Sequence, residues 1–388
     1  MRTCGTIIRG IRAPILKKGD DLATICTESL FAAVENENFS IENQDILGIT
    51  EAVLARTQGN YASVEDIATD INKKFRGDKI GLVFPIMSRN RFSLILKGIA
   101  LTNKKIIVQF SYPSDEVGNP IISAEKLNST KINPWEDVFT SREFIETFGD
   151  HRHPFTGINY IELYESIGNT EVIMANNPTE ILNHADEILV CDIHTRETTK
   201  KMIRDAGAKT VFALDEILNC DTNGSGYNPQ YGLLGSNIAS ETQLKLFPRD
   251  ADIFVKKVQS LIKEKTGKLI EVLIYGDGGF KDPVGLIWEL ADPIISPGFT
   301  DGLSGLPKEV KIKYLADNKF ANLSGNALSA AIKKHLASEN EDESEKEGTT
   351  PRRIVDLVGS LCDLASGSGS KGTPFVYIKG YFDHMGVE

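Results

Sequence analysis

Along most of the chain, segments whose apolar residues have helical spacing alternate with short apolar runs typical of strands. Residues 20–31 place their apolar side chains on one helical face, and Asp20 at their start is a good helix cap. The apolar run 46–49 predicts a short strand, and the residues after it predict a helix that ends at Gly59. Because strands and helices alternate in this way, the pattern predicts an α/β fold, with α+β as the alternative.

The stretch from Thr170 to Leu218 has the clearest strand–helix–strand pattern. Its three apolar runs, TEVIMA, DEILVCDI and KTVFAL, are typical of buried strands, and a helix is predicted from Thr195 to Gly207. These runs predict a small parallel sheet. The turn after the first run reads MANNPTE and lacks the G-x-G-x-x-G spacing, so a Rossmann-type NAD site is not supported.

The C-terminal part of the sequence combines a predicted helix and strand with a long polar segment. A helix is predicted over residues 252–265, followed by the strand KLIEVLIYGDG. Residues 338–353 contain no apolar side chain, and we expect them to form a mobile surface loop.

Composition and charge narrow the class of protein. With 388 residues, 41% of them hydrophobic and 25% charged, the chain can form two or three folded domains. The net charge of −11 argues against nucleic acid or a membrane surface as a partner, so any anionic ligand must be held locally. The chain shows no signal-peptide core and no long apolar run, and its five cysteines are irregularly spaced. These features predict a cytoplasmic protein.

A carboxylate stands at the end of a predicted strand in LIEVLIYGDGGFKDPVG. Asp277 lies between glycines, which allow a phosphate or another backbone segment to come close. Asp282, Glu289 and Asp292 follow, and such oxygen ligands would suit Mg²⁺ or Mn²⁺. The alternative is that Asp277 is an ordinary turn residue.

The segment DLASGSGSKGTPFVYIKG surrounds one lysine with small residues. It does not match the P-loop pattern, because Lys371 follows Ser370 instead of a glycine and a strand comes next. Residues 366–373 could still form a nest of backbone N–H groups that binds phosphate. Composition alone favours a plain flexible turn.

Four segments together resemble the coenzyme F-420-0:L-glutamate ligase family, whose members add γ-linked glutamate to a deazaflavin cofactor using GTP. The first two are GIRAPILKKGDDLATI and QDILGITEAVLARTQGN. The third runs from GLLGSN through LKLFPRDAD and TGKLIEVLIYGDGG, and the fourth is the glycine- and serine-rich segment near the C-terminus. The order and spacing of these segments carry the resemblance, which covers less than half of the chain.

The resemblance implies a domain organisation. Residues 1–61 and 231–388 would form the ligase-like core, and residues 62–230 would be an inserted α/β region that shorter family members largely lack. It also implies a homodimer.

The resemblance further implies site residues. Arg56 stands at the family's lysine and, with Asp277, is a predicted catalytic residue; Asp277 and Asp282 are the predicted metal ligands. Two carboxylates of the family pattern are replaced here, by Leu234 and Ser368. The implied nucleotide contacts are Ala13, Pro14, Ile15, Leu16, Glu51, Ala52, Arg56, Asn237, Ser366, Gly367, Ser368, Gly369, Ser370, Lys371, Gly372 and Thr373.

The implied activity is a ligase reaction that depends on GTP or ATP and on Mg²⁺ or Mn²⁺. L-glutamate, or a similar amino acid, would be joined to a carboxylate of a small acceptor through an acyl phosphate. Two alternatives remain open: a nucleotide- or metabolite-binding protein that kept the fold without the reaction, and a folate-type γ-glutamyl ligase.

Overall fold

A computed structural model describes most of the chain, namely residues 4–86, 92–116, 118, 120–152, 157–277, 294–307, 311–336, 352–367 and 371–383. The chain divides into two compact units. The first unit comprises residues 1–57 and 250–388, and the second unit comprises residues 58–249. The sequence-based prediction assigned residues 231–388 to the ligase-like core. In the structure, residues 231–249 cluster with the second unit. Most of the predicted mobile loop, namely residues 338–351, lies outside the described residues.

The first unit is built on a five-stranded mixed sheet, in the order β1-β14-β2-β12-β13. Only β2 and β12 are parallel neighbours, and the other adjacent strands run antiparallel. Its strands are β1 (Ile7–Ile11), β2 (Ile46–Thr50), β12 (Glu271–Asp277), β13 (Ile294–Phe299) and β14 (Phe375–Lys379). Its helices are α1 (Leu22–Asn36), α2 (Glu51–Gln58, which crosses into the second unit), α9 (Ala251–Thr266), α10 (Ile312–Tyr314), α11 (Gly325–Leu336) and α12 (Ile354–Ser366).

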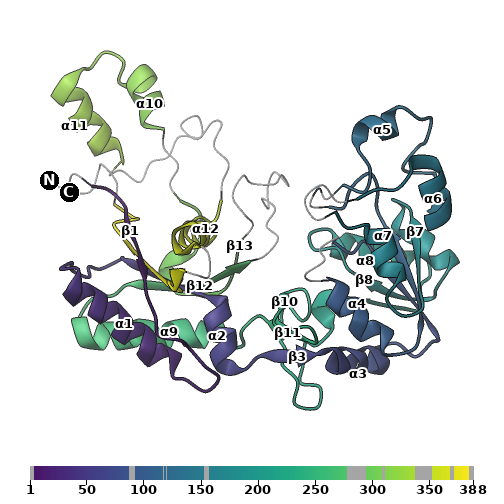
Figure 1. Ribbon diagram of the computed structural model, residues 1–388. Coiled ribbons are helices and arrows are strands. Elements are labelled where there is room, and N and C mark those ends of the chain that lie inside the picture. The colour runs from purple at the N-terminus through teal and green to yellow at the C-terminus, as the bar shows by residue number, and fades with distance from the viewer. Residues whose placement is uncertain are drawn as a thin grey trace. The chain divides into compact units, whose positions relative to one another are not determined.

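Helices cover both faces of this sheet, with α1 and α9 on one face and α12 on the other (Figure 1). The alternation of side chains along each strand produces the two layers: in β2, Leu47 and Ile49 pack towards α1 and α9, and Ile46 packs towards α12. Strands buried on both faces are nearly continuous apolar runs, which explains why the run 46–49 was recognisable as a strand.

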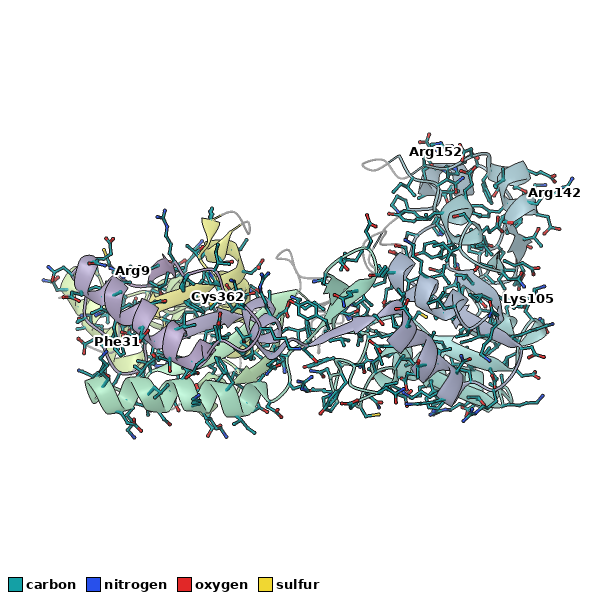
Figure 2. The ribbon with its side chains drawn as sticks, turned by 60° about the horizontal axis from the view of Figure 1, so that its bottom comes forward. Arg9, Phe31, Lys105, Arg142, Arg152 and Cys362 are labelled. Atoms are coloured by element: carbon teal, nitrogen blue, oxygen red, sulfur yellow. The ribbon has the colours of Figure 1, made fainter. Side chains whose placement is uncertain are left out.

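Close packing of α12 requires a glycine in the central strand. A Cβ atom at Gly48 would lie 2.4 Å from Sγ of Cys362, which is buried on α12 and labelled in Figure 2. Any larger residue at position 48 would therefore push the helix away from the sheet.

The second unit contains a six-stranded sheet in the order β6-β7-β5-β4-β8-β9, and a three-stranded sheet in the order β10-β11-β3. Its strands are β3 (Tyr61–Ser63), β4 (Lys79–Val83), β5 (Lys105–Phe110), β6 (Phe139–Thr140), β7 (Thr170–Met174), β8 (Glu187–Val190), β9 (Thr210–Ala213), β10 (Ser236–Ile238) and β11 (Gln243–Leu246). Its helices are α3 (Val64–Lys74), α4 (Phe92–Ala100), α5 (Ala124–Asn128), α6 (Ser141–Phe148), α7 (Tyr160–Glu165) and α8 (Arg196–Asp205).

All strands of the six-stranded sheet except β6 are parallel. The chain proceeds from β4 outwards through β5 to β7, and then returns to the other side of β4 for β8 and β9. This arrangement is the doubly wound α/β topology. The predicted parallel sheet of residues 170–218 is therefore present but larger than predicted, because β5 and β4 lie between β7 and β8.

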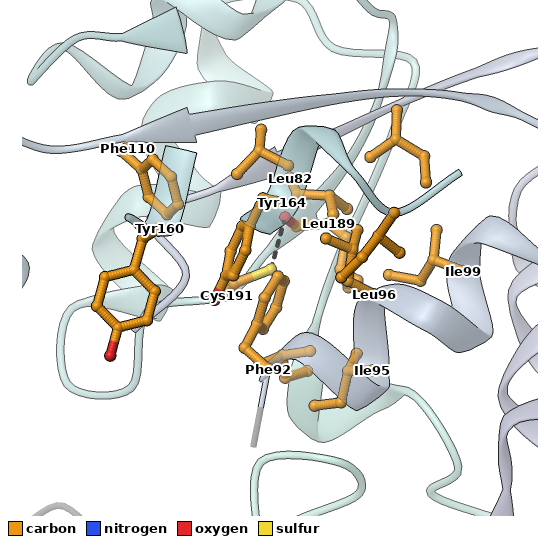
Figure 3. Close-up of a cluster of buried hydrophobic side chains, with 14 of the residues drawn as sticks. Leu82, Phe92, Ile95, Leu96, Ile99, Phe110, Tyr160, Tyr164, Leu189 and Cys191 are labelled. Atoms are coloured by element: carbon orange, nitrogen blue, oxygen red, sulfur yellow. Dashed lines mark hydrogen bonds between the residues drawn. The ribbon is translucent and has the colours of Figure 1, made fainter. Parts of the chain in front are cut away.

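An aromatic and aliphatic cluster fills one face of this sheet (Figure 3). Tyr164 of α7 is fully buried, with ring centroids 5.7 Å from Phe92 and 5.1 Å from Phe110. Among the described residues of both units, no helix is long and apolar enough to cross a membrane.

Candidate functional site

Two parallel strands of the first unit end at the same edge of its sheet. Thr50, the last residue of β2, pairs with Tyr275 of β12. Glu51 follows β2 directly as the first residue of α2, and Asp277 is the last residue of β12. The carboxyl ends of parallel strands are where α/β proteins bind ligands, so this edge is the candidate site.

Two further segments reach the same edge because their strands run antiparallel. β14 begins there, next to the end of β2, and the backbone N–H of Thr50 donates to the carbonyl of Pro374 at 3.0 Å. β1 ends there, and the N–H of Ala13 donates to the carbonyl of Gly372 at 3.1 Å. Four segments that are far apart in sequence therefore meet at one sheet edge.

The segment 366–373 connects α12 to β14. Gly367 ends the helix with a φ of +65°, a value that favours glycine. The Thr373 hydroxyl donates to the carbonyl of Ser366 at 2.8 Å, which ties the two ends of the loop together. The exposed Lys371 folds back over Gly367, so that a Cβ there would lie 2.5 Å from its Nζ. Residues 368–370 lie outside the described residues.

Glu51 occupies the space that Gly276 leaves open. Its side chain is buried, with 3% exposed, and its Cγ would lie only 2.0 Å from a Cβ at Gly276. The sequence suggested that the glycines beside Asp277 admit a phosphate or backbone. At Gly276 the close neighbour is the side chain of Glu51. The Glu51 side chain therefore packs against Gly276 of β12, the residue just before Asp277.

Helix α2 also anchors the segment that follows β1. Nε of Arg56 donates to the carbonyl of Leu16 at 2.7 Å, and the N–H of Gly19 donates to the carbonyl of Thr57 at 2.8 Å. Arg56 is exposed, so its guanidinium is accessible to solvent. The side chain predicted to contact phosphate therefore also positions Leu16, another predicted contact.

The segments at this edge carry exposed positive charge in a chain whose net charge is negative. These basic residues are Arg12, Lys17, Lys18, Arg56 and Lys371. Behind them, burial raises the pKa of Tyr275 well above its usual range, and the Ser366 side chain partly opposes this shift. Tyr275 therefore stays neutral, and the charge that an anion meets comes from the basic residues.

The remaining predicted residues lie elsewhere. Asn237 lies in β10 of the second unit, where it pairs with Lys245 of β11, so its contact with a nucleotide stays a prediction. Leu234, at a position where the family pattern has an aspartate, is buried in the second unit's core. Asp282 lies outside the described residues. Within the described ranges, no group of three or more acidic, histidine or cysteine side chains could hold a metal ion.

A sequence profile of the F420-0:Gamma-glutamyl ligase family matches residues 10–380. The chain belongs to this family. The match spans both units and nearly the whole sequence, and it supports a γ-glutamyl-ligase type of function in general. No curated protein matches the chain.

Gly276 and Gly372 shape this sheet edge in ways that the sequence alone did not reveal. The run of glycines around Asp277 indicated a close approach, but only the pairing of β2 with β12 shows that Glu51 makes it. Gly372 contributes through its carbonyl, which no side-chain pattern could indicate.

Proposed function

We propose that this family member is a nucleotide-dependent amide ligase that joins L-glutamate, or a similar amino acid, to a carboxylate of a small acceptor. The observation that supports the proposal is the meeting of four distant segments, rich in glycine and basic residues, at the carboxyl edge of the first unit's sheet. GTP or ATP is the phosphate donor in this proposal.

The nucleotide would lie against the segments 13–16 and 366–373 and the start of α2, at Glu51 and Ala52. Backbone N–H groups at a helix start and in a glycine-rich loop bind phosphate oxygens well. Lys371 and Arg56 would add positive charge, Arg56 through a planar fork that matches two phosphate oxygens.

In this proposal a divalent metal ion binds at the same edge. Mg²⁺ in nucleotide sites is commonly held by one or two carboxylates together with substrate phosphates. Glu51 supplies a buried carboxylate, and Asp277 follows Gly276, against which Glu51 packs. These two residues would hold Mg²⁺ or Mn²⁺, which would offset negative charge on the phosphates.

The proposed reaction has two steps. A carboxylate oxygen of the acceptor attacks the γ-phosphorus, and the bond to the oxygen bridging the β-phosphorus breaks, which gives an acyl phosphate and a nucleoside diphosphate. The amine of the amino acid then attacks the acyl carbon, phosphate leaves, and the amine loses a proton. The chain's residues hold the phosphates in line and stabilise charge as it develops.

The substitution Asp277→Asn tests the proposal. We expect nucleotide turnover to be lost with little change in stability, because the substitution keeps the shape of the side chain and removes its charge. Turnover would be followed by phosphate release, and product by mass spectrometry of acceptor pools incubated with labelled glutamate. Asp186→Asn, at an exposed pair with Lys209 in the second unit, is the matched control. An unchanged rate in Asp277→Asn would remove Asp277 from the mechanism.

A binding protein that has lost the reaction is the second candidate, favoured by Leu234 and Ser368 at positions where the family pattern has carboxylates. Calorimetry with GTP and ATP, with and without Mn²⁺, separates the two. Metal-independent binding without turnover would favour the binding protein. The labelled-glutamate experiment also tests the folate-type ligase, which would show a folate product.

A further inference from the structure

Tyr275 of β12 carries a buried polar group next to the candidate site. Its side chain is 1% exposed and packs in the apolar cluster between the sheet and α12. Its hydroxyl makes no hydrogen bond with any residue in the described part of the chain. A buried polar group without a partner costs free energy, so this hydroxyl needs an explanation.

The Tyr275 ring lies beneath the C-terminal half of α12. A Cβ atom at Gly48 would lie 2.4 Å from Sγ of Cys362 and 3.4 Å from Cδ1 of Tyr275, so both side chains lie over this glycine. Tyr275 pairs with Thr50, which is two residues closer to the carboxyl edge than Gly48. Ser366 lies one helical turn beyond Cys362 on the same face of α12. The last turn of α12 therefore comes close to the ring.

The electrostatic surroundings of the hydroxyl agree with this placement. Burial raises the pKa of Tyr275 above its usual range, and the Ser366 side chain acts against this shift. Electrostatic interactions with Cys362 and Asp363 raise the pKa further. All three residues that act on the hydroxyl lie in the last two turns of α12.

Ser366 can accept a hydrogen bond from Tyr275 without losing the bonds it already makes. The Ser366 hydroxyl donates to the carbonyl of Asp363 at 2.9 Å, and the Ser366 carbonyl accepts the hydroxyl of Thr373 at 2.8 Å. A hydroxyl group donates one hydrogen bond and can accept two. A small shift of the last helical turn would therefore complete a chain from Tyr275 through Ser366 to the Asp363 carbonyl.

Ser366 also connects this chain to the segment that the proposed nucleotide would contact. The Thr373 hydroxyl holds the end of that segment against Ser366, and the carbonyl of Gly372 accepts the N–H of Ala13, another predicted contact. Hydrogen bonds that follow one another in a chain strengthen each other. A phosphate bound here would therefore act on the position of Ser366.

We propose that Tyr275 is a positioning residue of the nucleotide site. When phosphate binds beside the end of α12, the last helical turn moves towards the sheet, and the Tyr275 hydroxyl donates to Oγ of Ser366. Because this hydrogen bond forms only in the bound state, its free energy adds to the affinity for the nucleotide. The inference rests on the proposed function.

Calorimetry of the full chain with GTP and ATP, in the presence of Mg²⁺, tests this role with Tyr275→Phe. Without nucleotide, the thermal unfolding midpoint of the variant should equal or exceed that of the wild type, because the variant loses no hydrogen bond. Its nucleotide affinity should fall about fivefold, which corresponds to one typical hydrogen bond. Tyr164→Phe is the matched control, since it removes another buried hydroxyl without a described partner, in the second unit. It should bind as the wild type does.

A double-mutant cycle with Ser366→Ala tests whether Tyr275 acts through Ser366. Ser366→Ala should also weaken binding, and adding Tyr275→Phe to it should weaken binding no further. Ser360→Ala is the control within α12, because it removes a comparable hydrogen bond, from Ser360 to the carbonyl of Asp356 at 2.9 Å. In that background, Tyr275→Phe should keep its full effect. The cycle of Tyr275 and Ser366 should show no coupling in thermal unfolding without nucleotide.

Three results would overturn this role while leaving the ligase proposal intact. Tyr275→Phe could bind nucleotide as tightly as the wild type, or the effects of Tyr275→Phe and Ser366→Ala could add in full. The two residues could also be coupled equally strongly in unfolding without nucleotide, which would mean that the hydrogen bond exists before binding. If the wild type binds neither GTP nor ATP, the proposed function and this role both fail.

Discussion

Among the described residues, the two units carry different charged side chains at the carboxyl edges of their sheets. In the first unit, exposed basic residues and glycines line the edge where β2 and β12 end. In the second unit, Asp115, Glu116 and Asp192 line the edge where β5 and β8 end. Parallel strand topology decides where a site forms, and the side chains placed there decide which ligand charge it accepts. We therefore expect an anionic phosphate at the first edge.

Gly276→Ala should have the largest effect on the first edge. The new Cβ would lie 2.0 Å from Cγ of Glu51, so the Glu51 carboxylate must move. We expect nucleotide turnover to fall about 100-fold and Mn²⁺ binding, followed by electron paramagnetic resonance, to weaken.

Gly5→Ala is the control for Gly276→Ala, because no atom lies within 4 Å of a Cβ at Gly5. Wild-type turnover and Mn²⁺ binding in Gly276→Ala would show that the approach of Glu51 to β12 is not needed at the first edge.

Gly48→Ala should destabilise the first unit without touching either edge directly. Its Cβ would meet Sγ of Cys362 at 2.4 Å, and overpacking of this kind costs about 1–3 kcal/mol of unfolding free energy. Hydrogen exchange should show faster opening of β2 and α12, with the second unit unaffected. The added substitution Cys362→Ala should recover part of the loss; no recovery would contradict the packing explanation.

Glu116→Gln tests the charge of the second edge through pH. The pKa of Glu116 in the folded protein is about 7, raised from 4.5 mainly by burial, so the folded state keeps a proton that the unfolded chain loses as the pH rises through this window. This group's contribution to stability is full below pH 4.5 and is lost by about pH 7, at most about 3 kcal/mol. The charges of Asp115 and Asp192 and the backbone N–H groups of Ile193 and His194 act on Glu116, and all four residues are unchanged in the variant.

The measurement is the thermal unfolding midpoint of the second unit between pH 5 and pH 8. The wild type should lose more stability over this range than Glu116→Gln. Glu187→Gln controls for loss of a carboxylate that accepts two backbone N–H groups, from Arg76 and Gly77. Equal pH slopes in the wild type and Glu116→Gln would contradict the burial of an ionisable Glu116.

Arg56→Ala should have the smallest effect. It removes the 2.7 Å hydrogen bond to the carbonyl of Leu16 at an exposed site, which contributes about 1 kcal/mol. KM for the nucleotide should rise several-fold. Arg56→Lys keeps the positive charge but lacks the planar guanidinium, so we expect an intermediate KM. Equal KM values in the wild type and both variants would show that Arg56 does not contribute to nucleotide binding.

Local pattern predicted many elements because strands buried on both faces are apolar runs. The strand predicted over residues 46–49 is β2, and the helix predicted after it is α2. The helix predicted over residues 252–265 is α9, which begins and ends one residue further out. The predicted cap of the first helix was off by one residue, since Asp21 precedes α1. The sequence-based prediction grouped residues 231–249 with the ligase-like core. In the structure these residues cluster with the second unit, where β11 pairs with β3, a contact between segments far apart in sequence.

The sequence by itself determined the alternation of helices and strands, the net charge and the glycine-rich segments, since each depends on neighbouring residues. Only the tertiary structure decided that Glu51 packs against Gly276 and that β4 and β5 separate β7 from β8. These features depend on strand order and register between distant segments, and local residue patterns do not encode which strands become neighbours.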